Sequence, residues 1–157
     1  MLGRFEQASS IFETASHAAK DANLPVIYAE ILGSQADIAM KQGQTDNALA
    51  AHKEALEVQV ELGDAKGAAR TYNNMGYLYR RKNDRGKALE AYSEVEAIIN
   101  SDETLLSAQI ILGRALLDLG EVERARKHAF EAFERTDRAD DLLAHARAQA
   151  LLGRYHA

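Results

Sequence analysis

A unit of about 40 residues recurs along this chain of 157 residues, and an internal repeat constrains a fold more than any other sequence feature. The clearest copy has Gly43 followed five residues later by Ala48 and seven residues after that by Ala55. The same offsets start from three other anchor positions, which are Gly3, Asn83 and Gly120. Successive anchors are 40, 40 and 37 residues apart. This regularity predicts one structural unit that is copied several times and stacked on itself.

The residue types in every copy favour helix. Pro25 is the single proline, and alanine, leucine, glutamate, arginine and glutamine, which lose little rotamer freedom in a helix, are abundant. One apolar stripe with a period of about 3.6 residues contains Ala88, Leu89, Tyr92, Val95, Ile98 and Ile99. No segment alternates like a strand. The prediction is an all-α fold with about eight helices over 4–21, 24–41, 44–62, 64–82, 84–99, 101–118, 121–136 and 140–156.

Small residues recur at fixed places where two helices would have to approach closely. Gly76 and Gly113 stand seven residues before their anchors, in mid-helix positions where glycine costs about 1 kcal/mol relative to alanine. We expect close packing against Ala88 and Ala125 to offset this loss. Turns that need a left-handed backbone are expected at the anchors Gly43, Asn83 and Gly120.

Helix ends and starts between the copies carry their own signals. Leu62-Gly63-Asp64 predicts a helix end followed at once by an N-cap, and Pro25 is expected in the first turn of a helix. Ser101 is expected to cap a helix whose first turn contains Asp102 and Glu103. The copies would then be joined by short turns.

Two stretches resemble a known family. Asn73–Tyr79, followed by Asn83–Asp84 and Lys87–Tyr92, is similar to a tetratricopeptide repeat, and Leu112–Ala125 is similar to another. The usual unit has about 34 residues. The longer spacing resembles the variant found in kinesin light chains, Pins-type polarity adaptors, Rap-type quorum regulators and MalT-like transcription activators.

The resemblance implies a right-handed α-solenoid of antiparallel helix pairs. It divides a single array over 1–157 into a partial repeat 1–22, repeats 23–63, 64–100 and 101–139, and a partial repeat 140–157. The register starts at the turn before a second helix and stops inside a first helix. We therefore expect either a fragment of a longer array or ends that pair between chains.

No motif for catalysis or metal binding emerges from the sequence. There are no cysteines, and the five histidines show neither an HExxH arrangement nor a shared i, i+4 spacing. Gly63–Gly67 lacks the spacing of a dinucleotide loop, Asp140–Asp141 suits a helix start, and no Gly-x-Ser-x-Gly elbow is present. We expect no enzyme activity, no cofactor and no metal.

Charge and hydropathy also limit the partners. The formal net charge of -5 disfavours nucleic acid, and no apolar run approaches the roughly 20 residues that span a bilayer. The N-terminus lacks the apolar core of a signal peptide. We expect a cytoplasmic protein that binds neither nucleic acid nor membrane.

In the family, the first helix of each pair lines an inner groove. The matching positions here are Glu30, Ser34, Asp37, Lys41, Arg70, Asn73, Asn74, Tyr77, Arg80, Arg81, Ser107, Ile110, Arg114, Asp118, Arg147 and Arg154. Seven of these are basic and three acidic, the reverse of the whole chain. The resemblance implies peptide-binding roles for Asp37, Lys41, Arg70, Asn73, Asn74, Tyr77, Arg81, Arg114 and Arg147.

The expected function is a protein-interaction scaffold or adaptor that grips a peptide or protein segment, with an acidic or C-terminal segment as the first ligand to test. Two alternatives stay open at this point. One is a peptide-sensing regulatory domain of a larger signalling or transcription-regulating protein, and the other is a structural module that self-associates through its ends. The simpler interpretation of each single arginine is a solvated side chain or one paired with a nearby glutamate.

Overall fold

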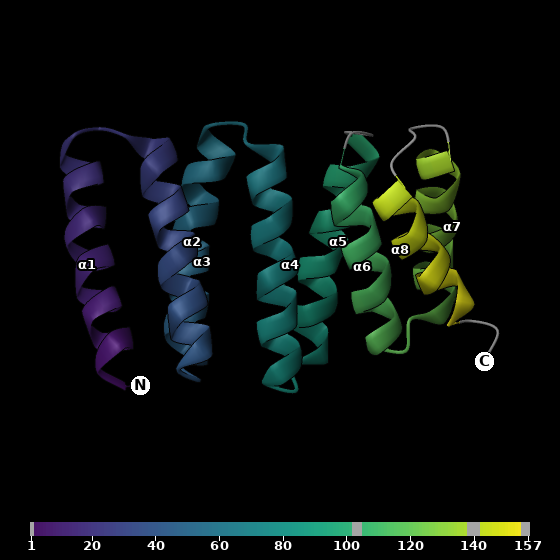
Figure 1. Ribbon diagram of the computed structural model, residues 1–157, viewed down its shortest axis with the longest axis horizontal. Helices are drawn as coiled ribbons and strands as arrows, with labels where there is room; N and C mark the ends of the chain where they lie inside the picture. Colours follow the sequence, from purple (N-terminus) through teal and green to yellow (C-terminus); the bar gives the residue numbers. More distant parts are fainter. Residues whose placement is uncertain (1, 102–104, 138–141, 155–157) are drawn as a thin grey trace. The chain divides into compact units, whose positions relative to one another are not determined.

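The computed structural model describes residues 2–101, 105–137 and 142–154, and Figure 1 shows helices along the whole of this part. They are α1 (Leu2–Asp21), α2 (Pro25–Lys41), α3 (Thr45–Glu61), α4 (Ala65–Arg81), α5 (Arg85–Ser101), α6 (Leu106–Asp118), α7 (Val122–Asp137) and α8 (Leu142–Gly153). The described residues contain no strand, which confirms the all-α prediction. The chain divides into two compact units, Met1–Leu78 and Tyr79–Ala157.

The anchor residues make the turns that were expected of them. The φ angles are +75° at Gly43, +58° at Asn83 and +78° at Gly120. After α2, the backbone N–H of Gln44 donates to the carbonyl of Ala39, and the N–H of Gly43 donates to the carbonyl of Met40. The same pair of bonds follows α4 and α6. A left-handed residue therefore ends each of these helices and satisfies its last carbonyls.

In the first unit, small side chains bring α2 and α3 together. Ala36, Ala48 and Ala55 are completely buried, as the repeated alanines predict. Asp64 caps α4 by accepting a hydrogen bond at its Oδ1 from the backbone N–H of Gly67, at 2.9 Å. Pro25 opens α2, also as predicted. The starts of α2 and α4 are thus set by the local sequence.

The core of the second unit is formed by α5, α6 and α7. Its completely buried side chains include Val95, Leu112, Leu116, Ala125, Ala129 and Ala132. A Cβ built on Gly113 would lie 3.4 Å from the carbonyl oxygen of Ala125 and 3.5 Å from Cβ of His128. The close approach of α6 and α7 at Gly113 and Ala125 is confirmed.

A partly buried polar cluster ties α5 to α7. The carboxylate of Glu96 accepts hydrogen bonds from the guanidinium of Arg124 and contacts Nε2 of the buried His128 at 2.7 Å. Burial raises the pKa of Glu96, but the hydrogen bonds from Arg124 and His128 outweigh it and hold the pKa below its usual value. His128 is therefore a packing residue of the second unit.

One helix boundary differs from the prediction. Ser101 does not cap the next helix but is the last residue of α5, where its Oγ donates to the carbonyl of Ile98 at 2.7 Å. The following helix begins at Leu106. The Asp140–Asp141 pair, with Asp102 and Glu103, lies outside the described residues. Within the stretches that the structure covers, no helix combines the length and apolar character of a membrane span.

Candidate functional site

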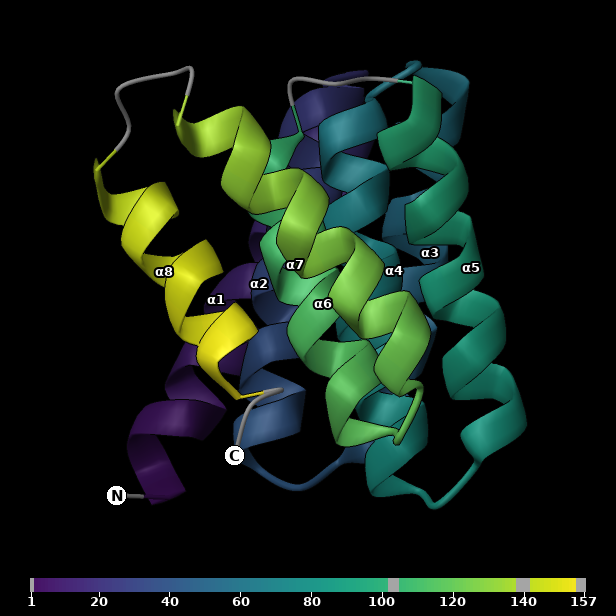
Figure 2. The same ribbon diagram turned by 90° about the vertical axis from the view of Figure 1, so that its right-hand side faces the viewer.

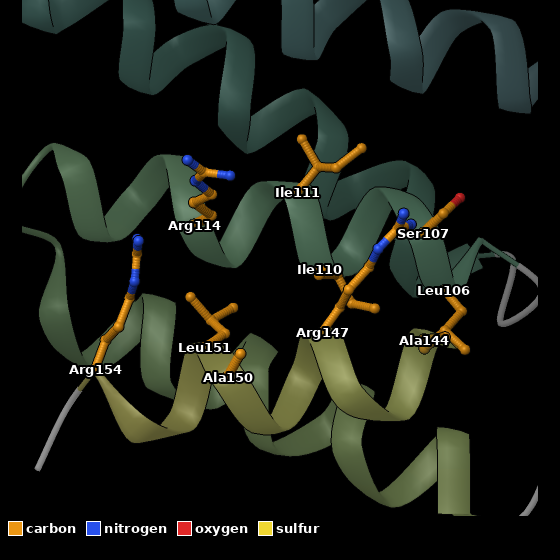
Figure 3. Close-up of a pocket in the computed structure, with 10 residues that line it drawn as sticks. All are labelled: Leu106, Ser107, Ile110, Ile111, Arg114, Ala144, Arg147, Ala150, Leu151 and Arg154. Carbon is orange, nitrogen blue, oxygen red and sulfur yellow. The ribbon is translucent and has the colours of Figure 1, made fainter. Parts of the chain in front are cut away.

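A cavity of about 710 Å³ lies between α6 and α8 in the second unit, and Figure 3 shows the side chains around it. The apolar part of its lining consists of Leu106, Ile110, Ile111, Ala144, Ala150 and Leu151. The polar part consists of Ser107, Arg114, Arg147 and Arg154. No described carboxylate lines it. The site therefore combines an apolar surface with positive charge.

Helical spacing explains why these side chains meet. Positions 107, 110, 111 and 114 follow one face of α6, and positions 144, 147, 151 and 154 follow one face of the α8 segment. Figure 2 shows α8 lying beside α6 and α7. Cδ2 of Leu151 comes within 2.9 Å of the place where a Cβ of Gly113 would lie, so Leu151 packs directly over the glycine. The absent side chain at Gly113 allows α8 to lie on α6 and form one wall of the cavity.

The charge of this cavity is not neutralised by the described residues. Arg114, Arg147 and Arg154 are exposed and have no ion-pair partner within the part of the chain that the structure describes. Figure 3 shows Arg147 and Arg154 extending from the α8 side toward α6. By contrast, Arg80 is paired with Asp118 at 3.2 Å. Three guanidinium groups around one cavity can form forked hydrogen bonds to carboxylates.

The structure brings two of the sequence-predicted residues of the second unit, Arg114 and Arg147, into this one site. Arg81, the last residue of α4, is exposed and is not part of the cavity lining. The apolar lining was missed by the sequence interpretation, apart from Ile110. Its sequence signal is helical spacing, with four residues between Leu106 and Ile110 and seven between Ala144 and Leu151.

In the first unit, the charges of two predicted residues, Asp37 and Arg70, act on a buried histidine. His52 on α3 is 2% exposed, and its Nδ1 has no hydrogen-bond partner among the described residues. Burial lowers the pKa of His52, the charge of Asp37 raises it and that of Arg70 lowers it further. Burial therefore favours the neutral form of the imidazole. Asp37 on α2 and Arg70 on α4 are themselves exposed.

The other predicted residues of the first unit differ in accessibility. Asn73 is only 7% exposed, and its Oδ1 has no hydrogen-bond partner in the described structure. Asn74 is half-buried, whereas Lys41 and Tyr77 are exposed. A ligand backbone N–H would satisfy the buried oxygen of Asn73. The peptide-binding roles of these four residues stay predictions.

A sequence model of the tetratricopeptide repeat family matches residues 28–101. Residues 28–101 carry tetratricopeptide repeats. The matched segment contains the Asn73–Tyr79 stretch on which the resemblance rested.

Two solved structures share the fold of this chain. BtubC (BKLC) from P. vanneervenii aligns with a TM-score of 0.72 and 19% identity, covering 97% of this chain and 72% of that chain. A putative kinesin light chain with nearly identical TPR-like repeats, from Podosopora anserina, aligns with a TM-score of 0.70 and 17% identity, covering 97% and 77%. These likenesses confirm the prediction of a solenoid built from tetratricopeptide-like helix pairs.

One curated relative matches over part of the array. It is the outer dynein arm-docking complex subunit 4 of Xenopus laevis, with 27% identity over 105 residues, which is 66% of this chain and 19% of the relative. The chain thus spans about a fifth of the length of that protein.

Tetratricopeptide repeats, which match over residues 28–101, are generally non-enzymatic modules for protein interaction. The described residues contain no group of three or more His, Cys, Asp or Glu side chains placed to hold a metal ion. The chemistry that the described site supports is recognition of charge and apolar surface.

Proposed function

We propose that the cavity between α6 and α8 binds an acidic segment of a partner protein. The observation that carries this proposal is the set of three arginines, Arg114, Arg147 and Arg154, which surround an apolar cavity and have no ion-pair partner within the described residues. A ligand carboxylate would bind in forked geometry to a guanidinium. The proposal includes a run of aspartates or glutamates and a C-terminal carboxylate, which share this chemistry.

The apolar lining adds a second requirement to the ligand. Ile111 is 55% exposed at the cavity, and Leu106 and Ile110 are partly exposed beside it. Burial of apolar surface contributes about 25 cal/mol for each Å² removed from water. An acidic segment that also carries an aliphatic side chain would use both parts of the lining, so it should bind more tightly than a purely acidic one.

The test is a pair of charge reversals, Arg114→Glu with Arg147→Glu, measured by fluorescence anisotropy. The probes are two labelled short peptides with the same leucines, one carrying glutamates and the other carrying lysines in their place. We expect the double reversal to weaken binding of the acidic peptide at least about tenfold. Binding by the wild-type protein should weaken as salt rises from about 50 to 300 mM, because exposed charges are screened.

The matched control is the reversal of Arg126 and Lys127, which are exposed on α7 of the same unit and change the net charge equally. This variant should bind the acidic peptide within about twofold of the wild type. Equal weakening by both double reversals would show that net charge, and not the cavity, controls binding. Amidation of the peptide's C-terminus distinguishes its side-chain carboxylates from its C-terminal carboxylate. The amidated peptide loses affinity only if the C-terminal carboxylate is the group that binds.

A further inference from the structure

A second and smaller cavity, of about 270 Å³, lies within the first unit. It is formed where α1 ends, α2 begins and the C-terminal half of α3 passes beside them. Leu24, Pro25, Val58 and Tyr28 provide its apolar surface. Leu24 is 45% exposed and Val58 is half-buried, so part of this surface is open to solvent.

Three carboxylates of α3 line the same cavity. Glu54, Glu57 and Glu61 are three and four residues apart and therefore share one face of the helix. Glu54 accepts a hydrogen bond from the hydroxyl of Tyr28. Glu57 and Glu61 are exposed and have no ion-pair partner within the described residues. Like charges at these spacings repel each other, so a bound cation would relieve the repulsion.

The chain's own Lys20 shows which group this cavity accommodates. Its Nζ lies 3.7 Å from Oε1 of Glu54 and 5.4 Å from the ring centroid of Tyr28. An ammonium group is thus held between a carboxylate and an aromatic face, an arrangement that attracts cations. Lys20 is the only basic side chain in the described lining, against three acids. The remaining charge of the cavity is complementary to a cationic ligand.

The position of the acids along α3 increases the attraction. Glu61 is the last residue of α3, and the last turn of this helix has no basic residue. The C-terminal end of a helix carries partial negative charge, so an acid there is destabilising and a cation is favoured. Figure 1 shows the end of α1, the start of α2 and the end of α3 at the same edge of the first unit. Asp21, the last residue of α1, adds a further carboxylate at this edge.

We infer that this cavity is a second docking surface, which binds a basic segment of a protein partner. In that segment a lysine or arginine lies beside an apolar residue. The cation lies near Glu57 and Glu61, and the apolar side chain packs on Leu24, Pro25 and Val58. The inference goes beyond the proposed function because it concerns the other unit and a ligand of opposite charge. The two ligands would make the protein a scaffold for two different segments.

The test uses the whole chain and the lysine-and-leucine peptide described above as its probe. Glu57→Gln with Glu61→Gln removes two charges and keeps the side-chain shape, and circular dichroism checks that helix content is unchanged. The matched control is Glu90→Gln with Glu94→Gln, an exposed pair on α5 with the same four-residue spacing. We expect the first double variant to weaken binding of the basic peptide about tenfold and the control to change it less than about twofold.

Three results would overturn the inference. One is equal affinity of the two double variants for the basic peptide. Another is an equal loss of affinity for the basic and the acidic peptide when Glu57 and Glu61 are both replaced by glutamine. The third is a concentration-dependent increase of mass in sedimentation that the same changes abolish, since a second copy of the chain would then be the occupant. The Arg114 and Arg147 reversals act in the other unit, so failure of the proposed function would leave this outcome unaffected.

Discussion

The buried, titratable side chain of His52 makes the stability of the first unit depend on pH. Its folded-state pKa is lowered, chiefly by burial, below the value of about 6.5 in an unfolded chain. Well above pH 6.5 the imidazole is neutral in both states, and the stability of the first unit is fully present. As the pH falls below that value, the unfolded chain takes up a proton that the folded chain does not, so stability is lost.

We expect the free energy of unfolding to decrease from pH 7 to pH 5 more steeply in the wild type than in His52→Leu, with the difference limited to about 1.4 kcal/mol per pH unit. Urea unfolding followed by circular dichroism at several pH values measures it. His17→Leu, at an exposed position on α1, is the control and should keep the wild-type slope. Identical slopes for the wild type and His52→Leu would show that the histidine is hydrated in the folded state.

At the scale of elements, the packing of α8 on α6 depends on the missing side chain of Gly113. A Cβ there would lie 2.9 Å from Cδ2 of Leu151 and 3.4 Å from the carbonyl oxygen of Ala125. Alanine would normally stabilise a helix by about 0.4–1 kcal/mol relative to glycine, but overpacking costs about 1–3 kcal/mol. We expect Gly113→Ala to lower the free energy of unfolding of the second unit by about 1 kcal/mol, measured in urea.

The control for that measurement is Gly86→Ala, in the first turn of α5 in the same unit. The atom nearest to a Cβ at Gly86 is Oδ1 of Asp84, at 3.8 Å, so the added methyl group fits. Its expected effect is a stabilisation of about 0.5 kcal/mol. If Gly113→Ala stabilised the protein by a similar amount, Leu151 would not pack over Gly113 as the structure has it.

The turns and the helix ends show how far local sequence determines an element. Glycine and asparagine adopt a left-handed backbone more readily than other residues. The turns at Gly43, Asn83 and Gly120 could therefore be assigned from the sequence. The role of Ser101 could not be assigned in this way, because a serine can either cap the next helix or form a hydrogen bond within its own helix. Here it donates to the carbonyl of Ile98 in its own helix. The choice depends on where the preceding helix stops.

The candidate site was predictable to a smaller extent than the helices. Helical spacing and the family resemblance placed Arg114 and Arg147 on inner faces, and both line the cavity. The cavity itself follows from how closely α8 approaches α6, which depends on Leu151 packing over Gly113. The acidic row on α3 is visible as a spacing in the sequence, but its partner Lys20 comes from another helix. Residue spacing in the sequence therefore could not predict the contacts between helices.

Although the formal net charge of the chain is -5, its two cavities carry charge of opposite sign, and each lies within its own unit. If binding followed net charge alone, any substitution that makes the chain more negative would weaken binding of the acidic peptide and strengthen binding of the basic one. If binding is local, each pair of substitutions affects only the ligand of its own unit. The double reversal of Arg114 and Arg147 separates these cases, because it lowers the net charge by four units without touching the first unit.

We expect this reversal to leave the affinity for the basic peptide within about twofold of the wild type, because Arg114 and Arg147 line only the cavity of the second unit and salt screens exposed charges. The Glu57→Gln, Glu61→Gln protein should likewise keep its affinity for the acidic peptide. Titration calorimetry of each peptide with each variant measures both, with a stoichiometry of one peptide to one chain. A basic peptide that bound more tightly to the arginine reversal and to the Arg126, Lys127 control alike would show that net charge steers it. The two cavities would then not act as separate docking surfaces.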